Sequence, residues 1–362
     1  MYTEAFIIFI WEIPFMTIND IATLAGVSKS TVSRVLNNAS NVNEKTRQLV
    51  LKVMKENNYV PSCMARALNK NKNNVIGLIL PDVDSAFFGA IVHGINDVLK
   101  KTDYTILLCC TYNNPQDELH ALYALQQQRV SGLFLTTSSS FATPKDAQMI
   151  TNAVRDIKAP VVLIDRIFPN TSWDGVYSDN FSGAYSAVRT LIECGYRKIG
   201  AYISDMKLQI GQERYNGFQL AMSNANIPID KKYLFLDDFS VSHKDIYDYT
   251  CQQIQKNNLP DAIFLSNKII TNGFFKAIFE NGIVPGKDIH CIGFDYSELI
   301  DILNIPYSYL ERNLNLFGQT SAHLLLSRKN NESPVQRNYT IPATLHIHES
   351  LAKQHVKNAD II

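Results

Sequence analysis

Residues 28–37 of the chain contain side chains that could recognise a nucleic acid. Arginine can bond guanine through two parallel hydrogen bonds, asparagine can bond adenine in the same way, and hydroxyl groups can bond phosphates or base edges. No acidic residue interrupts the segment, whose polar side chains are Ser28, Lys29, Ser30, Thr31, Ser33, Arg34 and Asn37. These residue types suit the major groove of double-stranded DNA. The alternative is an ordinary helical hairpin with a polar face toward solvent.

Two short helices and a tight turn would be needed to present this segment. Apolar residues at helical spacing indicate the first helix, and Gly26 and Val27 interrupt the pattern. Ser28 can cap a second helix, and Asn43 can start a third over residues 44–57. The side chains expected in the shared core are Ile18, Ile21, Ala22, Ala25, Val32, Val35, Leu36, Leu49, Val50, Val53 and Met54.

The sequence TINDIATLAGVSKSTVSRVLN (residues 17–37), followed by YVPSCMARAL (residues 59–68), resembles the lac-repressor and galactose-repressor family of bacterial transcription regulators. The resemblance extends from about residue 16 to residue 350. It implies that the second helix reads the operator and that Thr17 is among the DNA-binding residues. It also implies a hinge helix, about 62–69, that inserts Leu68 into the minor groove with Ala65 beside it. Such an apolar wedge bends the duplex; the alternative is one apolar position on a linker helix.

The charge distribution separates the N-terminal part from the rest of the chain. Residues 16–74 contain nine basic and three acidic side chains, a surplus of six positive charges. The whole chain has 34 basic and 34 acidic residues, so the remainder carries the matching negative surplus. A basic N-terminal segment joined to an acidic remainder is the electrostatic pattern of nucleic-acid binding.

Length and composition indicate a globular cytoplasmic protein of two or three domains. The 362 residues are 46% hydrophobic and 19% charged, and no stretch approaches the roughly 20 apolar residues of a membrane helix. The six cysteines lack metal-site spacing and lie mostly in apolar runs, as expected for reduced core residues. Residues 1–15 have neither a basic start nor a small-residue cleavage site, so we expect a start codon placed too early rather than a signal peptide or an anchor.

From Val75 onward, strand-like apolar runs alternate with helix-like segments. Helices are expected at 87–101, 116–128, 182–194, 212–224, 242–257 and 271–281, with strands between them. Such alternation implies parallel sheets covered by helices on both faces, and the number of strands suits two Rossmann-like lobes. The family resemblance makes these lobes an α/β effector domain of the periplasmic-binding-protein type. A ligand would bind in the cleft where the carboxyl ends of the strands meet.

The pattern and the resemblance together predict the division of the chain. An all-α helix-turn-helix head is expected at 16–60, a hinge at 61–74 and the effector-binding and dimerisation domain at 75–350. Its first lobe would comprise about 75–178 and 309–334, and its second lobe about 179–306 and 337–350. The chain would cross between the lobes near Ser178, near Tyr307 and near residue 335. Residues 1–15 and 351–362 would be an extension and a tail.

Charged and aromatic residues at the expected strand ends are the candidates for effector binding. Phe87 and Phe88 follow the first strand, and Phe88 is the one assigned to stack on a ligand ring. The resemblance matches Arg214 to an effector-binding arginine and Asp295 to a position that bonds ligand hydroxyls. The full candidate set is Phe88, Asp165, Arg166, Asp179, Arg214, Asn267, Asp295 and Arg312. The alternatives are core packing for the phenylalanines and structural ion pairs for the charged residues.

One departure from the family pattern concerns the charge of the ligand. Where the family usually has Asn-Asp after a strand, this chain has Asn267 and Lys268. With the three candidate arginines, Lys268 could make a basic cleft, which a neutral sugar does not require but a carboxylate or phosphate would. Alternatively, Lys268 faces solvent and Arg312 pairs with Glu311 or Asp295.

Enzyme classes find little support in the sequence. No GxSxG, P-loop, HExxH or GxGxxG motif occurs, and the lone pair His346 and His348 fits one exposed face of a strand better than a metal site. No cofactor is expected. A secreted sugar-binding protein of the same two-lobe fold is the alternative, but it would have a signal peptide and no helix-turn-helix.

The sequence therefore predicts a DNA-binding transcription regulator, specifically a repressor of a carbohydrate-utilisation operon. It would act as a symmetric homodimer on a pseudo-palindromic operator. A sugar, sugar acid or sugar phosphate in the cleft would shift the lobes and so form or melt the hinge helices.

Overall fold

The computed structural model describes residues 16–36, 39–59, 73–138, 144–329 and 335–351. Its contacts divide the chain into two units, residues 1–73 and 74–362, and each unit is described by itself. Asn37, Ala65 and Leu68 lie outside the described residues, and so do most of the expected hinge, the N-terminal extension and nearly all of the tail. Within the described ranges, no helix is long and apolar enough to cross a membrane.

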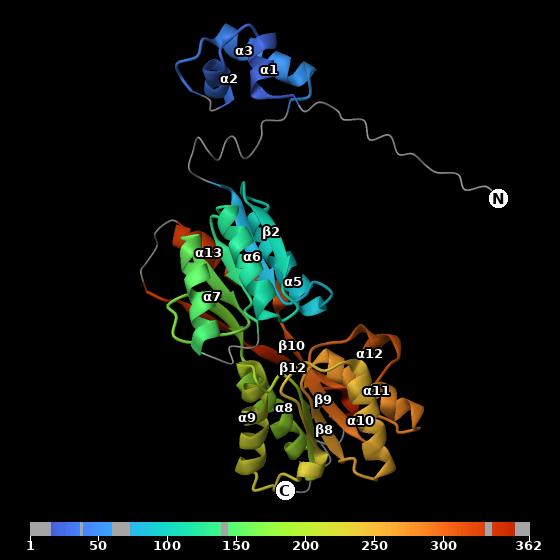
Figure 1. Cartoon of the computed structure of the whole chain (residues 1–362). Helices are drawn as coiled ribbons and strands as arrows, with labels where there is room; N and C mark the ends of the chain where they lie inside the picture. Colours follow the sequence, from blue (N-terminus) through green and yellow to red (C-terminus); the bar gives the residue numbers. More distant parts are fainter. Residues whose placement is uncertain (1–15, 37–38, 60–72, 139–143, 330–334, 352–362) are drawn as a thin grey trace, which may run out of the picture. The chain divides into compact units, whose positions relative to one another are not determined.

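The first unit is a bundle of three helices around a small core (Figure 1). The helices are α1 (Ile18–Leu24), α2 (Lys29–Leu36) and α3 (Glu44–Glu56). Ile21, Val32 and Val50 are fully buried at its centre. The expectation for Leu49 was wrong, because this side chain is 46% exposed. Within the described residues, α3 packs against α1 and α2 through Val50, Val53 and Met54, and Leu49 lies outside this buried stripe.

Local sequence explains the start of α1 and the turn that follows it. The Thr17 hydroxyl accepts a hydrogen bond from the Asp20 amide, and the Asp20 carboxylate accepts one from the Thr17 amide at 2.7 Å. This reciprocal capping box satisfies two amides at the start of the helix. Gly26, with φ +63°, makes the turn into α2, a backbone conformation that other residues adopt only with strain.

The first lobe of the second unit is a six-stranded sheet in the order β11-β5-β4-β3-β1-β2, in which every neighbouring pair is parallel. Side chains of α5 and α13 pack on one face of the sheet, and those of α6 and α7 pack on the other. The strands are β1 (Val75–Leu80), β2 (Thr105–Cys110), β3 (Leu133–Leu135), β4 (Val161–Ile164), β5 (Asp174–Ser178) and β11 (Asn338–Ile341). The helices are α5 (Ala86–Leu99), α6 (Pro115–Gln127), α7 (Pro144–Ile157) and α13 (Leu314–Lys329).

The second lobe repeats this plan, with β12 as the one antiparallel strand of its sheet. The strand order is β12-β10-β9-β8-β6-β7, with α8 and α9 packed on one face and α10 and α11 on the other. The strands are β6 (Ile199–Ile203), β7 (Leu234–Leu236), β8 (Ala262–Leu265), β9 (His290–Phe294), β10 (Ser308–Arg312) and β12 (Ala343–His346). The helices are α8 (Asn180–Glu193), α9 (Gln209–Asn224), α10 (His243–Gln255), α11 (Lys268–Glu280), α12 (Glu298–Ile302) and a 3₁₀ turn (Lys231–Tyr233).

Two of the three expected crossings between the lobes were placed wrongly. The crossing after Ser178 agrees with the structure, since β5 belongs to the first sheet and α8 to the second lobe. However, β10 pairs with β9, so the second crossing follows Arg312 rather than Tyr307. Likewise β11 pairs with β5, so the third crossing lies between Ile341 and Ala343. The expected two-lobe α/β architecture is confirmed, and the corrected crossings place Ser178, Arg312 and Ile341 at the junction of the lobes.

Candidate nucleic-acid interface and ligand site

Helix α2 presents its polar face because its apolar face is buried. Val32 and Val35 lie in the core of the first unit, whereas Lys29, Ser30 and Arg34 are exposed. An exposed cation at each end of the helix and a hydroxyl between them could reach phosphates and base edges. Thr31 and Ser33 are half-buried, so they offer less of their surface.

Two of the expected DNA-binding hydroxyls are engaged within the protein. The Ser28 oxygen accepts a hydrogen bond from the Thr31 amide at 3.1 Å and lies 2.8 Å from the Ser30 hydroxyl, so Ser28 caps α2. Thr17 caps α1 in the same manner. Both residues therefore position helices, and a direct contact with DNA stays a prediction for each. Arg47 of α3 donates to the Ala39 carbonyl at 2.7 Å, which ties the loop after α2 to the core.

Several candidate residues follow the parallel strands, at the edge of each sheet where the sequence predicts the ligand cleft. Asp165 follows β4 and Asp295 follows β9, and both have a left-handed backbone, with φ +65° and +72°. This conformation is uncommon for a residue with a side chain, and it turns the chain sharply at the carboxyl edge of each sheet. Asp205, two residues beyond β6, has φ +60°. Three aspartates thus occupy equivalent bends at strand ends.

Arg312 bonds Asp295 within the cleft. Its Nε and Nη2 atoms donate to the Asp295 carboxylate at 2.9 Å and 2.6 Å, and Nη1 donates to the Ser178 hydroxyl at 3.4 Å. Nη1 also lies 4.0 Å from Oδ1 of Asp165, and the guanidinium carbon lies 4.2 Å from the centre of the Phe87 ring. One side chain at a crossing therefore contacts both lobes.

Arg214 is buried without a carboxylate partner. Its Nε donates to Oδ1 of Asn180 at 3.0 Å, its Nη1 donates to the Ser266 carbonyl at 2.5 Å, and its guanidinium lies 4.3 Å from the Phe294 ring. Both acceptors are neutral. Burial, and then the nearby charge of Arg312, lower the pKa of Arg214 to about 10. The guanidinium is still charged at neutral pH, and none of its hydrogen bonds within the described residues goes to an anion.

Arg166 has neutral hydrogen-bond partners as well. Its Nη1 donates to Oδ1 of Asn113 and to the Thr137 carbonyl, both at 2.7 Å, while its Nε is buried without a partner. Burial lowers the pKa of Arg166. Nearby, the buried Glu118 carboxylate accepts from the Ser138 amide at 2.6 Å, and burial raises its pKa. These contacts fix the backbone at the end of β3.

The structure places the remaining candidates in the core of a lobe or at the beginning of a helix. Phe88 is 7% exposed and belongs to the core of the first lobe. The neighbouring Phe87, rather than Phe88, contacts the Arg312 guanidinium. Asp179 and Asn267 cap α8 and α11 through the amides of Ser182 and Ile270. Lys268 begins α11 and is half-buried.

Several residues that contact the candidate arginines were not among the candidates for effector binding named from the sequence. They are Asn113, Thr137, Ser178, Asn180, Asp205, Ser266 and Phe294. Ser178 and Asn180 flank the candidate Asp179, so the strand-end signal was present. Ser266 contributes through its backbone carbonyl. Every residue has a backbone carbonyl, so the sequence gives no signal for this contact.

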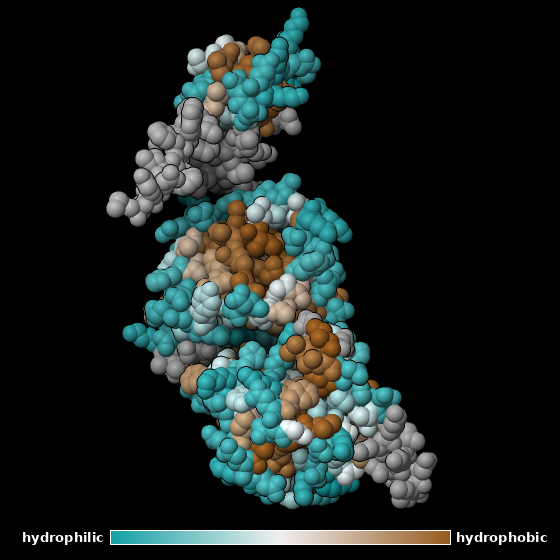
Figure 2. Space-filling model, turned by 90° about the vertical axis from the view of Figure 1, so that its right-hand side faces the viewer, coloured by the Kyte–Doolittle hydropathy of each residue, from teal (hydrophilic) through white to brown (hydrophobic). Residues whose placement is uncertain are grey.

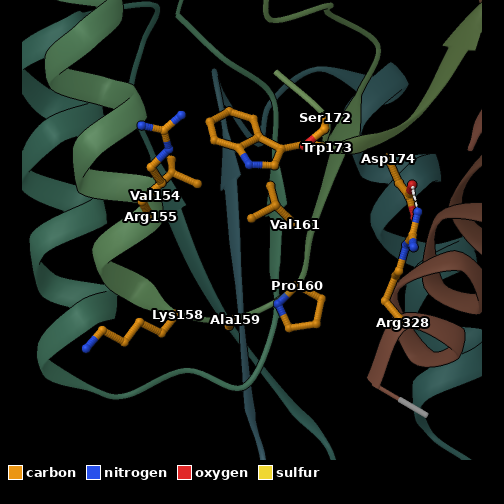
Figure 3. Close-up of a pocket in the computed structure, with 10 residues that line it drawn as sticks. All are labelled: Val154, Arg155, Lys158, Ala159, Pro160, Val161, Ser172, Trp173, Asp174 and Arg328. Atoms are coloured by element: carbon orange, nitrogen blue, oxygen red, sulfur yellow. Dashed lines mark hydrogen bonds and ion pairs between the residues drawn. The ribbon is translucent and has the colours of Figure 1, made fainter. Parts of the chain in front are cut away.

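A separate hollow of about 350 Å³ lies at the opposite edge of the first sheet (Figure 3). Its wall includes Pro160 and Val161 at the beginning of β4, whereas the ligand cleft lies at the end of that strand. Arg328 bonds the Asp174 carboxylate there at 2.6 Å. Ligands of open parallel sheets bind at the carboxyl ends of the strands, so this hollow does not belong to the ligand site.

Comparisons with known proteins agree with this architecture. Residues 17–62 match the family described as bacterial regulatory proteins, lacI family, and residues 188–351 match a periplasmic binding protein-like domain. The HTH-type transcriptional repressor PurR of Haemophilus influenzae (strain PittEE) is 30% identical over 312 residues, which is 86% of this chain and 90% of the relative. The HTH-type transcriptional regulator DegA of Bacillus subtilis (strain 168) is 30% identical over 315 residues, 87% and 91% of the two chains.

A solved structure of the lac repressor dimer, bound to operator and the anti-inducer ONPF, has the same fold. It aligns with a TM-score of 0.79 at 25% identity and covers 93% of this chain and 99% of that one. The helix-turn-helix head, the two lobes and the extent of these alignments lead to one conclusion. The chain belongs to the lacI family of bacterial regulatory proteins and is a DNA-binding transcriptional repressor rather than an enzyme.

Proposed function

We propose that this repressor controls a carbohydrate-utilisation operon and responds to an acidic sugar derivative, a sugar acid or a sugar phosphate, bound between its lobes. Arg214 is the observation that carries the proposal. Its hydrogen bonds among the described residues go to neutral acceptors, although the charges of Asp295, Asp165 and Asp205 act on it from nearby. A buried charge that bonds no anion directly is unfavourable, and an anionic group on the ligand would supply such a bond.

The pair of Arg312 and Asp295 sets a further condition on the ligand. Asp295 was expected to accept bonds from ligand hydroxyls, and Arg312 was expected to bind the anion. Because both Asp295 oxygens already accept bonds from Arg312, hydroxyls must share these oxygens with the guanidinium. The anion is therefore assigned to Arg214 first, with Arg166 and Lys268 adding positive charge to the cleft.

Operator recognition is assigned to α2 and to the hinge. Lys29, Ser30 and Arg34 are exposed for base and phosphate contacts, with Thr31, Ser33 and Asn37 completing the expected set. Ala65 and Leu68 keep the minor-groove role that the family resemblance implies. The lac repressor, which aligns over nearly the whole chain, binds its operator as a dimer, and this supports the same arrangement here.

Apolar surface on both lobes supports a homodimer. The edge strand β2 exposes Leu107 and Leu108 by 38% and 39%, and the region of α12 exposes Leu299, Ile302 and Leu303 by 45%, 74% and 59%. Hydrophobic areas are visible on both lobes in one view of the second unit (Figure 2). Exposed apolar edge strands and patches are typical of surfaces that another chain covers.

Calorimetry with matched ligands tests the effector proposal. Glucose, gluconate and glucose 6-phosphate share most of their hydroxyls and differ in charge. We expect an acidic member to bind more tightly than glucose, and Arg214→Ala to remove that preference. Tighter binding of glucose than of both acids would contradict the acidic-ligand proposal, whereas the repressor assignment would stand.

A further inference from the structure

A cavity of about 430 Å³ lies beside two of the crossings between the lobes. Ser178 and Asp179 form one of these crossings, and Thr340 precedes another. The cavity is lined by Asp165, Ile167, Tyr177, Ser178, Asp179, Asn180, Phe181, Gln209, Ile210, Glu213 and Thr340. This wall contains three carboxylates and no lysine, arginine or histidine.

Two of the three carboxylates in this wall accept the hydrogen bonds that the described residues show from neutral donors. Glu213 accepts from the amides of Gln209 and Asn180 at 2.5 Å and 3.2 Å, and Asp179 accepts from the Ser182 backbone amide at 2.9 Å. All of these donors are neutral. Neighbouring carboxylates raise one another's free energy when ionised, and a cation placed among them relieves that cost.

Asp165 provides a second, independent observation. Its side chain is 6% exposed, and Oδ1 is buried with no hydrogen-bond partner. Nη1 of Arg312 forms a long ion pair with this oxygen at 4.0 Å, beyond hydrogen-bond distance, and donates its hydrogen bond to Ser178 instead. A buried acceptor without a donor is costly, and the cavity that Asp165 lines is the space from which a ligand could supply one.

The rest of the wall fits the carbon skeleton of an organic ligand. Ile167 and Phe181 are exposed by 43% and 38%, so they offer apolar surface to an occupant. The cavity is also linked to the anion site assigned above through Asn180. Asn180 accepts from Arg214 through Oδ1 and donates to Glu213 through Nδ2, so one side chain belongs to both.

We propose that this cavity binds the ammonium group of the effector, so that the effector carries an amine as well as an anion. The amine would donate to Asp165 and Glu213 while the anion bonds Arg214. The anion part of this arrangement rests on the proposed function, whereas the amine part rests on the cavity alone.

Calorimetry on the full-length protein with three matched pairs tests the proposal. The pairs are glucosamine 6-phosphate with glucose 6-phosphate, glucosamine with glucose, and 6-aminohexanoate with hexanoate. We expect the amine to bind about tenfold more tightly in at least one pair, the effect of one charge-assisted hydrogen bond. If no amine binds more tightly than its partner, or if none binds at all, the proposal is overturned.

Two variants test whether the preference for the amine arises from the cavity. Glu213→Gln and Asp165→Asn should each reduce the preference for the amine, while Glu193→Gln, an exposed position on α8, should keep it. An unchanged preference in both cavity variants would overturn the assignment. A preference for glucose over glucose 6-phosphate would instead contradict the acidic-ligand proposal, because that comparison varies only the phosphate.

Discussion

At the residue scale, the charged cluster around Arg312 determines how the two lobes meet. The guanidinium is bonded to Asp295 of the second lobe and contacts Ser178 and Phe87 of the first. Any movement of the lobes relative to each other would have to rearrange these contacts. Arg312 is therefore a structural residue at the junction of the lobes as well as a candidate for effector binding.

Removing Arg312 alone should be more harmful than removing the whole pair. Arg312→Met leaves the Asp295 carboxylate without its partner, and we expect a loss of about 3–5 kcal/mol in the free energy of unfolding of the effector domain. The double variant Arg312→Met/Asp295→Asn should recover much of this loss. Arg189→Met, which breaks the exposed pair with Glu193, is the control and should cost less than about 1 kcal/mol. Urea denaturation measures all three; equal losses for the single and double variants would contradict this account.

The exposed cations of α2 give a second prediction at this scale. Arg34→Ala should cost about 1–3 kcal/mol of operator binding and relax the preference at one base pair, because a bidentate contact with guanine is lost. Lys52→Ala on α3 removes the same charge away from α2 and should leave the base preference intact. Binding to an operator selected from random DNA is the measurement. An Arg34→Ala protein with unchanged base preference would exclude Arg34 from base recognition.

The residue types at strand ends were enough to identify most of the charged residues around Arg312, but not to determine which of them bond to each other. Asp295 and Arg312 were both candidates, and their mutual bond was one of the alternatives that the sequence left open. Phe88 was the expected ligand contact, but it is buried in the core, and it is Phe87 that lies against the Arg312 guanidinium. Consecutive helical residues point about 100° apart, so the rotation of α5 on its sheet decides which of the two is buried. The partners of Arg214 depend on a backbone carbonyl and on the crossing at Ser178, which no local pattern reveals.

At the element scale, glycines set how closely the helices of each layer pack. A side chain at Gly318 of α13 would place its Cβ 2.1 Å from the Ile91 carbonyl oxygen of α5, whereas a Cβ at Gly89 of α5 would meet nothing within 4 Å. The two positions share a residue type and a helical conformation. They differ in whether another helix backbone lies against them.

Alanine at these two glycines should therefore have opposite effects. Gly318→Ala must push α5 and α13 apart, and we expect a loss of about 1–3 kcal/mol in the stability of the first lobe. Gly89→Ala should stabilise the same lobe by about 0.5–1 kcal/mol, because alanine favours the helix and nothing obstructs its Cβ. Thermal unfolding compares the variants. Destabilisation by both substitutions to the same extent would show that the close approach at Gly318 is not the cause.

Elements with clear start signals were predicted well, and short elements near the crossings were not. Asn43 and Ser242 begin helices as expected, through side-chain caps. Helix α7 was missed, although Ile150, Val154 and Ile157 form its buried stripe. The strands β10 and β11 have only five and four residues, and alternation alone does not show which sheet a short strand joins. That choice depends on the packing of both lobes.

At the scale of the whole molecule, the proposed dimer would place two copies of α2 on one operator. A single helix-turn-helix makes few base contacts, and a dimer gains affinity because binding of the second half-site becomes intramolecular. In the proposed dimer, the effector domain would act on DNA binding through the arrangement of the two protomers. In this scheme the ligand shifts the population between lobe arrangements, and the hinge transmits the change.

The exposed apolar residues of both lobes lead to the last prediction. Leu108→Lys combined with Ile302→Lys should weaken dimerisation on the order of 100-fold or more, because burial of each large aliphatic side chain contributes about 1.5–3 kcal/mol. The control, Leu220→Lys on α9, changes a residue that is 41% exposed in the second lobe but outside both patches. Sedimentation equilibrium should show monomers for the double variant and dimers for the control. The double variant should also lose the advantage of a full operator over a single half-site. If it remains dimeric, the protomers associate through other surfaces, and the assignment of β2 and α12 to the interface is wrong.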